Sequence, residues 1–172
     1  MAFRPSGDGR VLAEFSSDEA ELIATLARQV GELIADRAAK PGDPAIARLL
    51  PTAYPDDVEA AAEFRRFTEN DLAARKVQNA ETVIGSIGHG TAGLDGAVLD
   101  GAATQAWLRT LTDIRLTLAA RLGIESDADN DADNDGDNGG NGNEDGAEAL
   151  AMRDVYDWLG YVQDSLVRAL DD

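Results

Sequence analysis

Apolar residues recur at helical spacing along four long stretches of this chain of 172 residues, and this pattern constrains its fold most strongly. The clearest stretch holds Trp107, Leu111, Ile114, Leu118 and Leu122, which are four, three, four and four residues apart. Side chains at such spacings share one face of an α-helix, so each stretch predicts a helix with one buried face. We therefore predict a mainly helical protein.

Capping residues and prolines set the expected helix boundaries. Ser16 and Glu19 form a capping box before the first helix, Asp43 and Asp100 can cap later helices, and Gly123 is suited to end one. The expected helices cover residues 18–39, a short segment from Pro44 to Leu50, residues 56–84, residues 101–122 and a final stretch from Met152 to Leu170.

The helix expected from Asp56 to Ile84 is the longest, at about 29 residues or roughly 43 Å. We predict one domain over residues 1–172, a compact multi-helix bundle around this long central helix. A short N-terminal β-hairpin is expected from Phe3–Pro5 and Arg10–Phe15, which flank a turn-rich tetrapeptide. The glycine-rich stretch from Gly85 to Gly101 is expected to be a connection between helices.

Residues 125–148 read ESDADNDADNDGDNGGNGNEDGAE, with ten acidic residues, no basic residue and no apolar side chain larger than alanine. Such a segment cannot bury enough surface to offset the entropy lost on ordering. We therefore predict a disordered acidic insertion loop over residues 125–147, within the helical domain. The whole chain carries a net charge of −18, and the chain outside residues 125–148 carries −8.

Composition excludes several classes of site and predicts no cofactor and no metal centre. The chain has no cysteine, which excludes disulfides, zinc–thiolate centres and iron–sulfur clusters, and one histidine, which excludes a zinc site with two or three imidazoles. No apolar run approaches the roughly 18 residues of a membrane span, and the N-terminus lacks the apolar region of a secretory signal. We expect a cytoplasmic protein.

Three sequence patterns resemble known sites, and each has a simpler explanation. Residues 88–93 match G-x-G-x-x-G, but they follow a predicted helix instead of a strand, which favours a loop containing a solvated His89. Residues 131–136 match the first half of an EF-hand loop, but position twelve is Gly142, which favours diffuse attraction of divalent cations. Asp56 and Asp57 fit a helix start better than a catalytic pair.

The polar side of the long helix supplies our candidate partner-binding residues: Arg65, Arg66, Glu69 and Lys76. A solvated face of ion pairs is the alternative reading of each of them. Acidic residues are interleaved with the bases, so the uncompensated positive surface needed for direct nucleic-acid binding is not expected. Asn70 and Asn79, together with Arg66 and Lys76, are the residues from which a small-molecule cleft would be assembled.

Several strings resemble an actinobacterial family catalogued as domain of unknown function twenty-seventeen. They include FRPSGDG, EAAAEFRRFTENDL, AWLRTLTDIRLTLAARLGI and YDWLGYVQDSLVRAL, and the resemblance covers nearly the whole chain except the acidic insertion. It implies a small, mostly helical cytoplasmic protein without an established enzymatic activity, and some members are named oxidative-stress transcriptional regulator. Redox sensing proposed for relatives depends on cysteines, which this chain lacks.

These features predict a non-enzymatic regulatory protein–protein interaction module, which the resemblance links to transcription and the stress response. The expected partner is a protein, with the transcription machinery as the candidate. A small-molecule-binding protein, or an enzyme with a site on the long helix, is the alternative. The partner, the oligomeric state and the regulatory trigger stay open.

Replacing residues 127–145 with a short Gly/Ser linker should leave helical content and melting temperature nearly unchanged at moderate salt, because the segment has no large apolar side chain to bury. At low salt the replacement should raise stability slightly, because it removes mutually repelling carboxylates. Circular dichroism and thermal unfolding check this expectation. A loss of cooperative unfolding would contradict the loop assignment.

Overall fold

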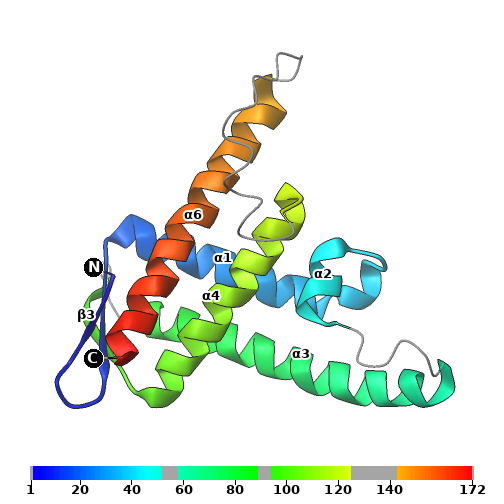
Figure 1. The fold of residues 1–172 in the computed structure, drawn as a ribbon, viewed down its shortest axis with the longest axis horizontal. Helices are drawn as coiled ribbons and strands as arrows, with labels where there is room; N and C mark the ends of the chain where they lie inside the picture. The colour runs from blue at the N-terminus through cyan, green and yellow to red at the C-terminus, as the bar shows by residue number, and fades with distance from the viewer. Residues whose placement is uncertain (1, 52–57, 89–93, 125–142, 172) are drawn as a thin grey trace.

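The computed structural model describes residues 2–51, 58–88, 94–124 and 143–171. In chain order the elements are β1 (Phe3–Pro5), β2 (Val11–Phe15), α1 (Ser17–Ala35), the 3₁₀ helix η1 (Arg37–Ala39), α2 (Pro44–Leu49), α3 (Val58–Gly88), β3 (Leu94–Leu99), α4 (Gly101–Leu122) and α6 (Asn143–Asp171). The protein is mainly helical and begins with a β-hairpin, which confirms the predicted fold class (Figure 1).

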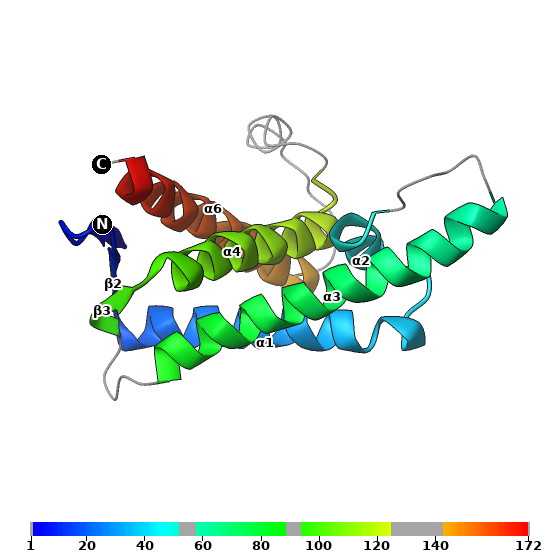
Figure 2. The same cartoon turned by 90° about the horizontal axis from the view of Figure 1, so that it is seen from below.

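The helix with the widest set of neighbours is α4, although α3 is longer. α1 and α3 run side by side, α4 crosses them, and α6 lies antiparallel along α4 (Figures 1 and 2). α2 also packs on α4. The longest helix, α3, was predicted to be the central one. In the structure α4 buries large side chains such as Trp107, Leu111 and Ile114. The described buried residues of α3 are smaller: Ala73, Ala80 and Val83.

The sheet contains a third strand that the sequence analysis missed. β1, β2 and β3 pair in that order, all antiparallel. β3 lies in the stretch expected to be a connection, where Asp95-Gly96 resembles a turn. Gly96 instead has φ +81° and is the extra residue of a bulge, between Ala13 paired with Ala97 and Glu14 paired with Asp95. Pairing with β2, far away in the sequence, makes this segment a strand.

An aromatic cluster joins the sheet to the helices. Trp107 of α4 is fully buried; its ring stacks on Phe15 of β2 at 5.6 Å between centroids and meets Phe3 of β1 edge-on at 5.4 Å. Its indole Nε1–H donates a hydrogen bond of 2.9 Å to the Ser86 hydroxyl of α3. Trp107 is thus buried, as its place in the apolar stripe predicts, and it joins α4 to both α3 and the sheet.

The outer edge of β1 is closed by a side chain from the other end of the chain. Phe3 N–H donates to Ser165 Oγ at 3.0 Å, and the same hydroxyl donates to the Phe3 carbonyl oxygen at 3.3 Å. Ser165 is buried, so both backbone groups of this edge residue find partners away from water. The N-terminal strand and the C-terminal helix α6 are thereby held together.

The predicted capping residues are confirmed at the helix ends. Ser16 and Glu19 form both bonds of the capping box, Asp43 accepts from Ala45 N–H, and Asp100 accepts from Ala103 N–H. α4 ends at Gly123 in the left-handed conformation. The first helix is shorter than expected, because α1 ends at Ala35 and the chain continues into η1.

The last helix begins earlier than expected. α6 starts at Asn143, so residues 143–147 of the predicted acidic loop are helical, and the linker replacement is best confined to residues 127–142. Residues 125–142 lie outside the described residues, as do Asp56, Asp57, His89 and the partial EF-hand pattern. In the final apolar stripe Leu159, Val162 and Leu166 are buried as predicted, and Met152 and Val155 are partly buried. Leu170 is exposed, and its neighbour Ala169 is buried.

Trp107→Ala should lower the free energy of unfolding by about 3–5 kcal/mol, because it removes a fully buried ring and leaves a cavity between two aromatic side chains. Urea unfolding measures the loss. Trp158→Ala is the matched control, and it should cost less because Trp158 is only partly buried. Unchanged stability in Trp107→Ala would show that the ring is not a core anchor.

Candidate functional site

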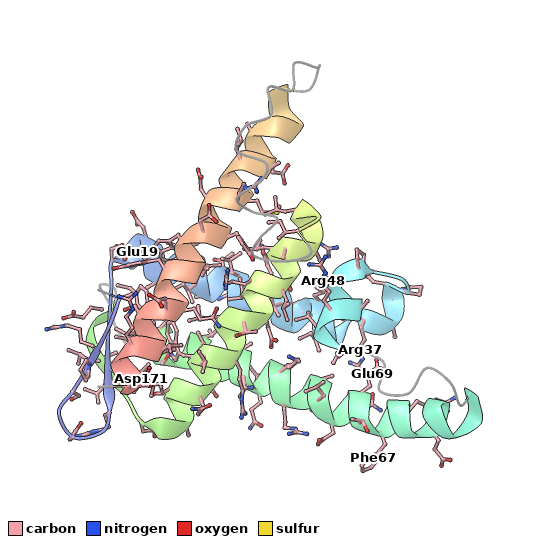
Figure 3. All side chains as sticks on the ribbon, viewed as in Figure 1. Glu19, Arg37, Arg48, Phe67, Glu69 and Asp171 are labelled. Atoms are coloured by element: carbon pink, nitrogen blue, oxygen red, sulfur yellow. The ribbon has the colours of Figure 1, made fainter. Side chains whose placement is uncertain are left out.

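The predicted partner-binding residues all belong to α3, but the structure gives them different environments. Arg66 is exposed, and next to it Phe67 is 80% exposed and points away from the body of the protein (Figure 3). The side chain of Arg65 lies outside the described residues. Aromatic residues and arginine are both enriched in the cores of protein interfaces. Phe67 was not predicted as a site residue, because an apolar residue in a helix is expected to lie on the buried face.

Glu69 is engaged inside the molecule by Arg37, a residue that the sequence analysis did not single out. Arg37 Nε donates to Glu69 Oε1 at 3.1 Å, and Nη2 donates to Asn70 Oδ1 at 2.7 Å. The third nitrogen, Nη1, donates to the Ile34 carbonyl oxygen at 2.9 Å, near the end of α1. One guanidinium therefore connects α3 to the end of α1. We call this set of contacts, Arg37 with Glu69, Asn70 and the Ile34 carbonyl, the Arg37 joint.

Lys76 is partly buried, which corrects the expectation that it lies exposed on the polar side of the long helix. Its Nζ contacts Asp113 Oδ1 of α4 at 2.5 Å, and the exposed fractions of the two side chains are 17% and 4%. Burial raises the pKa of Asp113 above its ordinary value, and the hydrogen bond and charge of Lys76 offset part of this rise. The pair connects α3 with α4.

Of the residues proposed to form a small-molecule cleft, one lies in a hollow formed by the described residues. A depression of about 510 Å³ lies beside α3, and of the four residues named from the sequence its lining contains only Asn70. Arg37, Gln78 and Glu81 supply the other polar groups, and Ala73, Ala74 and Val77 form its apolar part. Lys76 instead points to Asp113.

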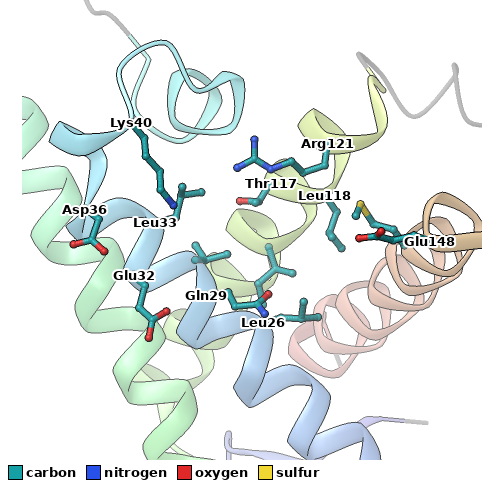
Figure 4. A pocket seen from close by; sticks show the side chains of 13 residues that line it. Leu26, Gln29, Glu32, Leu33, Asp36, Lys40, Thr117, Leu118, Arg121 and Glu148 are labelled. Carbon is teal, nitrogen blue, oxygen red and sulfur yellow. The ribbon is translucent and has the colours of Figure 1, made fainter. Parts of the chain in front are cut away.

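A second hollow, which we call the α1–α4–α6 groove, has an apolar floor and a charged rim (Figure 4). Its volume is about 510 Å³, within the range of roughly 300–1,000 Å³ typical of ligand sites. The floor consists of Leu26, Val30, Leu33, Ile114, Leu118 and Met152. No sequence pattern indicated this groove, because its floor combines residues that belong to three separate apolar stripes.

The charged groups of the groove differ in whether they are already paired within the protein. Arg121 donates two hydrogen bonds of 2.9 Å to the carboxylate of Asp43, and this guanidinium holds the pKa of Asp43 below its ordinary value. Asp43 also caps α2, so this pair holds α2 against α4. Three carboxylates are exposed: Glu32 of α1, Asp36 at the C-cap of α1, and Glu148 of α6. Lys40 is the other cation of the lining.

Within the described ranges, no group of three or more histidine, cysteine, aspartate or glutamate residues is placed to hold a metal ion. In the same part of the chain, no helix is long and apolar enough to cross a membrane.

Fold and surface together define a small helical domain built on α4 and capped at one end by a three-stranded sheet. The chain belongs to the family described as Domain of unknown function (DUF2017), whose model matches residues 1–170. This match confirms the family predicted from the sequence strings. No curated protein and no solved structure matches the chain.

Lys76→Met should destabilise the protein in a pH-dependent way, with a loss at pH 7 of about 3 kcal/mol or more in the free energy of unfolding. Without Lys76 the pKa of Asp113 should rise further in the folded state. The unfolded chain then releases this proton first, so the loss should grow as the pH rises from about 4 and should be small below that.

Urea unfolding at a series of pH values measures this effect. The double variant Lys76→Met/Asp113→Asn should lack the pH dependence over that range. Arg75→Met is the matched control on the same helix; its exposed pair with Asp71 should contribute less than about 1 kcal/mol. A loss that is the same at pH 4 and pH 7 would refute the role assigned to Asp113.

Proposed function

We propose that this protein is a non-enzymatic regulatory module that acts by binding another protein. The observation that carries the proposal is Phe67, a phenylalanine of α3 with 80% of its surface in water, which points away from the body of the protein (Figure 3). Burying such a side chain at an interface contributes about 1.5–3 kcal/mol. Arg66 beside it adds the residue type most often found with aromatic anchors.

The architecture of α3 supports this proposal. The Arg37 joint and the Lys76–Asp113 pair fasten the helix to α1 and α4, so Phe67 is presented on a rigid element. An anchor held in place before binding loses less conformational entropy on association than one on a mobile loop. The polar residues that the sequence suggested for binding thus divide into two groups, with Arg66 facing solvent and with Glu69 and Lys76 positioning the helix.

For the partner we propose the transcription machinery, and for the location the cytoplasm. The support for this finer proposal is the name that the family resemblance suggests. The net charge of −18 disfavours direct contact with DNA phosphates, so a regulator with this charge would act through a protein. The absence of cysteine leaves no thiol in the chain to act as a trigger.

Phe67→Ala should weaken capture of purified RNA polymerase by the immobilised protein at least about tenfold, because truncating an interface anchor typically costs 2 kcal/mol or more. Tyr161→Ala is the matched control, because it also removes an exposed aromatic ring, on α6. Melting temperatures of both variants should equal that of the natural chain. Equal capture by all three proteins would contradict the assigned surface.

A mobility-shift titration in the same buffer, at about 150 mM salt, separates protein contact from DNA contact. The protein should shift promoter DNA only when polymerase is present. Tight binding of promoter DNA by the protein alone, abolished by charge reversal at Arg65 and Arg66, would overturn the protein-contact proposal.

The alternative function is binding of a small molecule, with or without catalysis. The observation that favours it is the pair of hollows, each of about 510 Å³, because this volume suits a metabolite. Native mass spectrometry of the purified protein tests this alternative. A stoichiometric bound metabolite, together with failure to capture polymerase, would replace the proposed function with this one.

A further inference from the structure

The α1–α4–α6 groove is a hollow between three helices with an apolar lining. In the view of Figure 1 the N-terminal half of α6 extends away from the body. The floor side chains Val30, Leu33, Ile114 and Leu118 are buried at the base of the hollow. Leu26 and Met152, from α1 and α6, are only partly buried on its two sides. Farther along α6, Leu150 is 67% exposed. Leu150 is two positions from Met152, so it lies on a different side of α6 and outside the lining of the groove.

The shape of the groove suits the side chains of a helix. Amphipathic helices bind grooves of this kind by inserting apolar side chains from one face, at positions i, i+3 or i+4, and i+7, while their backbone stays outside. A volume of about 510 Å³ accommodates a few such side chains. Met152 contributes a flexible, unbranched wall that adapts to the side chains it receives.

The charges of the rim define the chemistry of the partner. Glu32 lies in the last turn of α1, Asp36 is the C-cap residue of that helix, and Glu148 lies on α6 (Figure 4). Among the described residues none of these three carboxylates forms an ion pair, whereas Arg121 is neutralised by Asp43. Among the described residues that line the groove, Lys40 is the one other cation. A cationic partner is therefore favoured at the rim and an anionic one is repelled.

We propose that the α1–α4–α6 groove binds the apolar face of a basic amphipathic helix from a protein partner, with its lysine or arginine side chains meeting Glu32, Asp36 and Glu148. This inference rests on the proposed function, because it presupposes a protein partner, and it assigns that partner a second contact apart from Phe67. The apolar floor supplies affinity, and the carboxylates select the charge and the direction of approach.

The test uses the full-length protein and a fluorescein-labelled synthetic peptide of lysine and leucine, with the leucines at helical spacing. Fluorescence anisotropy at about 150 mM salt should show saturable binding. A peptide with the same leucine spacing and glutamate in place of lysine should not bind. Equal binding of the two peptides would overturn the proposed charge selection, and failure of the lysine peptide to bind would overturn the proposal as a whole.

Charge reversal on the rim locates the binding site. Glu32→Lys/Asp36→Lys should weaken lysine-peptide binding at least tenfold. Glu81→Lys/Asp154→Lys changes the net charge equally at exposed positions on α3 and α6 outside the groove. This control should bind within a factor of two, because charges act over only about 8 Å at this ionic strength. Equal weakening in both double variants would mean that binding depends on net charge alone. That result would overturn the assignment of the peptide to the α1–α4–α6 groove.

The apolar floor is tested by Met152→Gln, with Leu170→Gln as the exposed control on the same helix. The first should weaken peptide binding several-fold, and the second should leave it unchanged. Polymerase capture then separates the two proposals. Capture that depends on Phe67 while the peptide fails to bind removes the groove proposal alone. Peptide binding without any polymerase capture supports the groove and removes the transcription partner.

Discussion

The contact of Trp107 with Phe15, Phe3 and Ser86 is the interaction on which the arrangement of the elements depends. It brings together β1, β2, α3 and α4, whose residues are far apart in the sequence. The ring also meets its one polar requirement, because the indole N–H reaches a hydroxyl inside the core. With this end of the bundle fixed, the rest of α4 can serve as the support on which α1, α2 and α6 pack.

The parts of the fold that local sequence determines could be predicted from it. Capping at Ser16, Asp43 and Asp100 depends on hydrogen bonds within a few residues, and the helix stripes depend on a fixed spacing, so both were confirmed. β3 could not be found in this way, because its strand conformation depends on pairing with β2, and its bulge at Gly96 resembles a turn. The central position of α4 likewise reflects packing on several sides, which one stripe does not indicate.

The sequence indicated which helix carries candidate binding residues, but not which of those residues face solvent. The sequence directed attention to the polar residues of α3, but it could not separate Arg66 from Lys76, because the difference between them is made by Asp113 on another helix. Glu69 forms an ion pair, which agrees with the alternative reading, but its partner Arg37 could not be identified from the sequence because it is 32 positions away. For Phe67 the difference runs the other way. An apolar residue in a helix is expected to be buried, and only the packing shows that nothing covers this one.

The hydroxyl of Ser165 has a consequence for the behaviour of this protein at high concentration. A sheet of three short strands has two edges, and an open edge is a template on which strands of other molecules can add. At Phe3 both backbone groups are already bonded to Ser165, so an incoming strand would have to displace α6 there. At the other edge, the Gly96 bulge interrupts the regular ladder of β3. The fold thus protects its small sheet against edge-to-edge aggregation with one serine and one glycine.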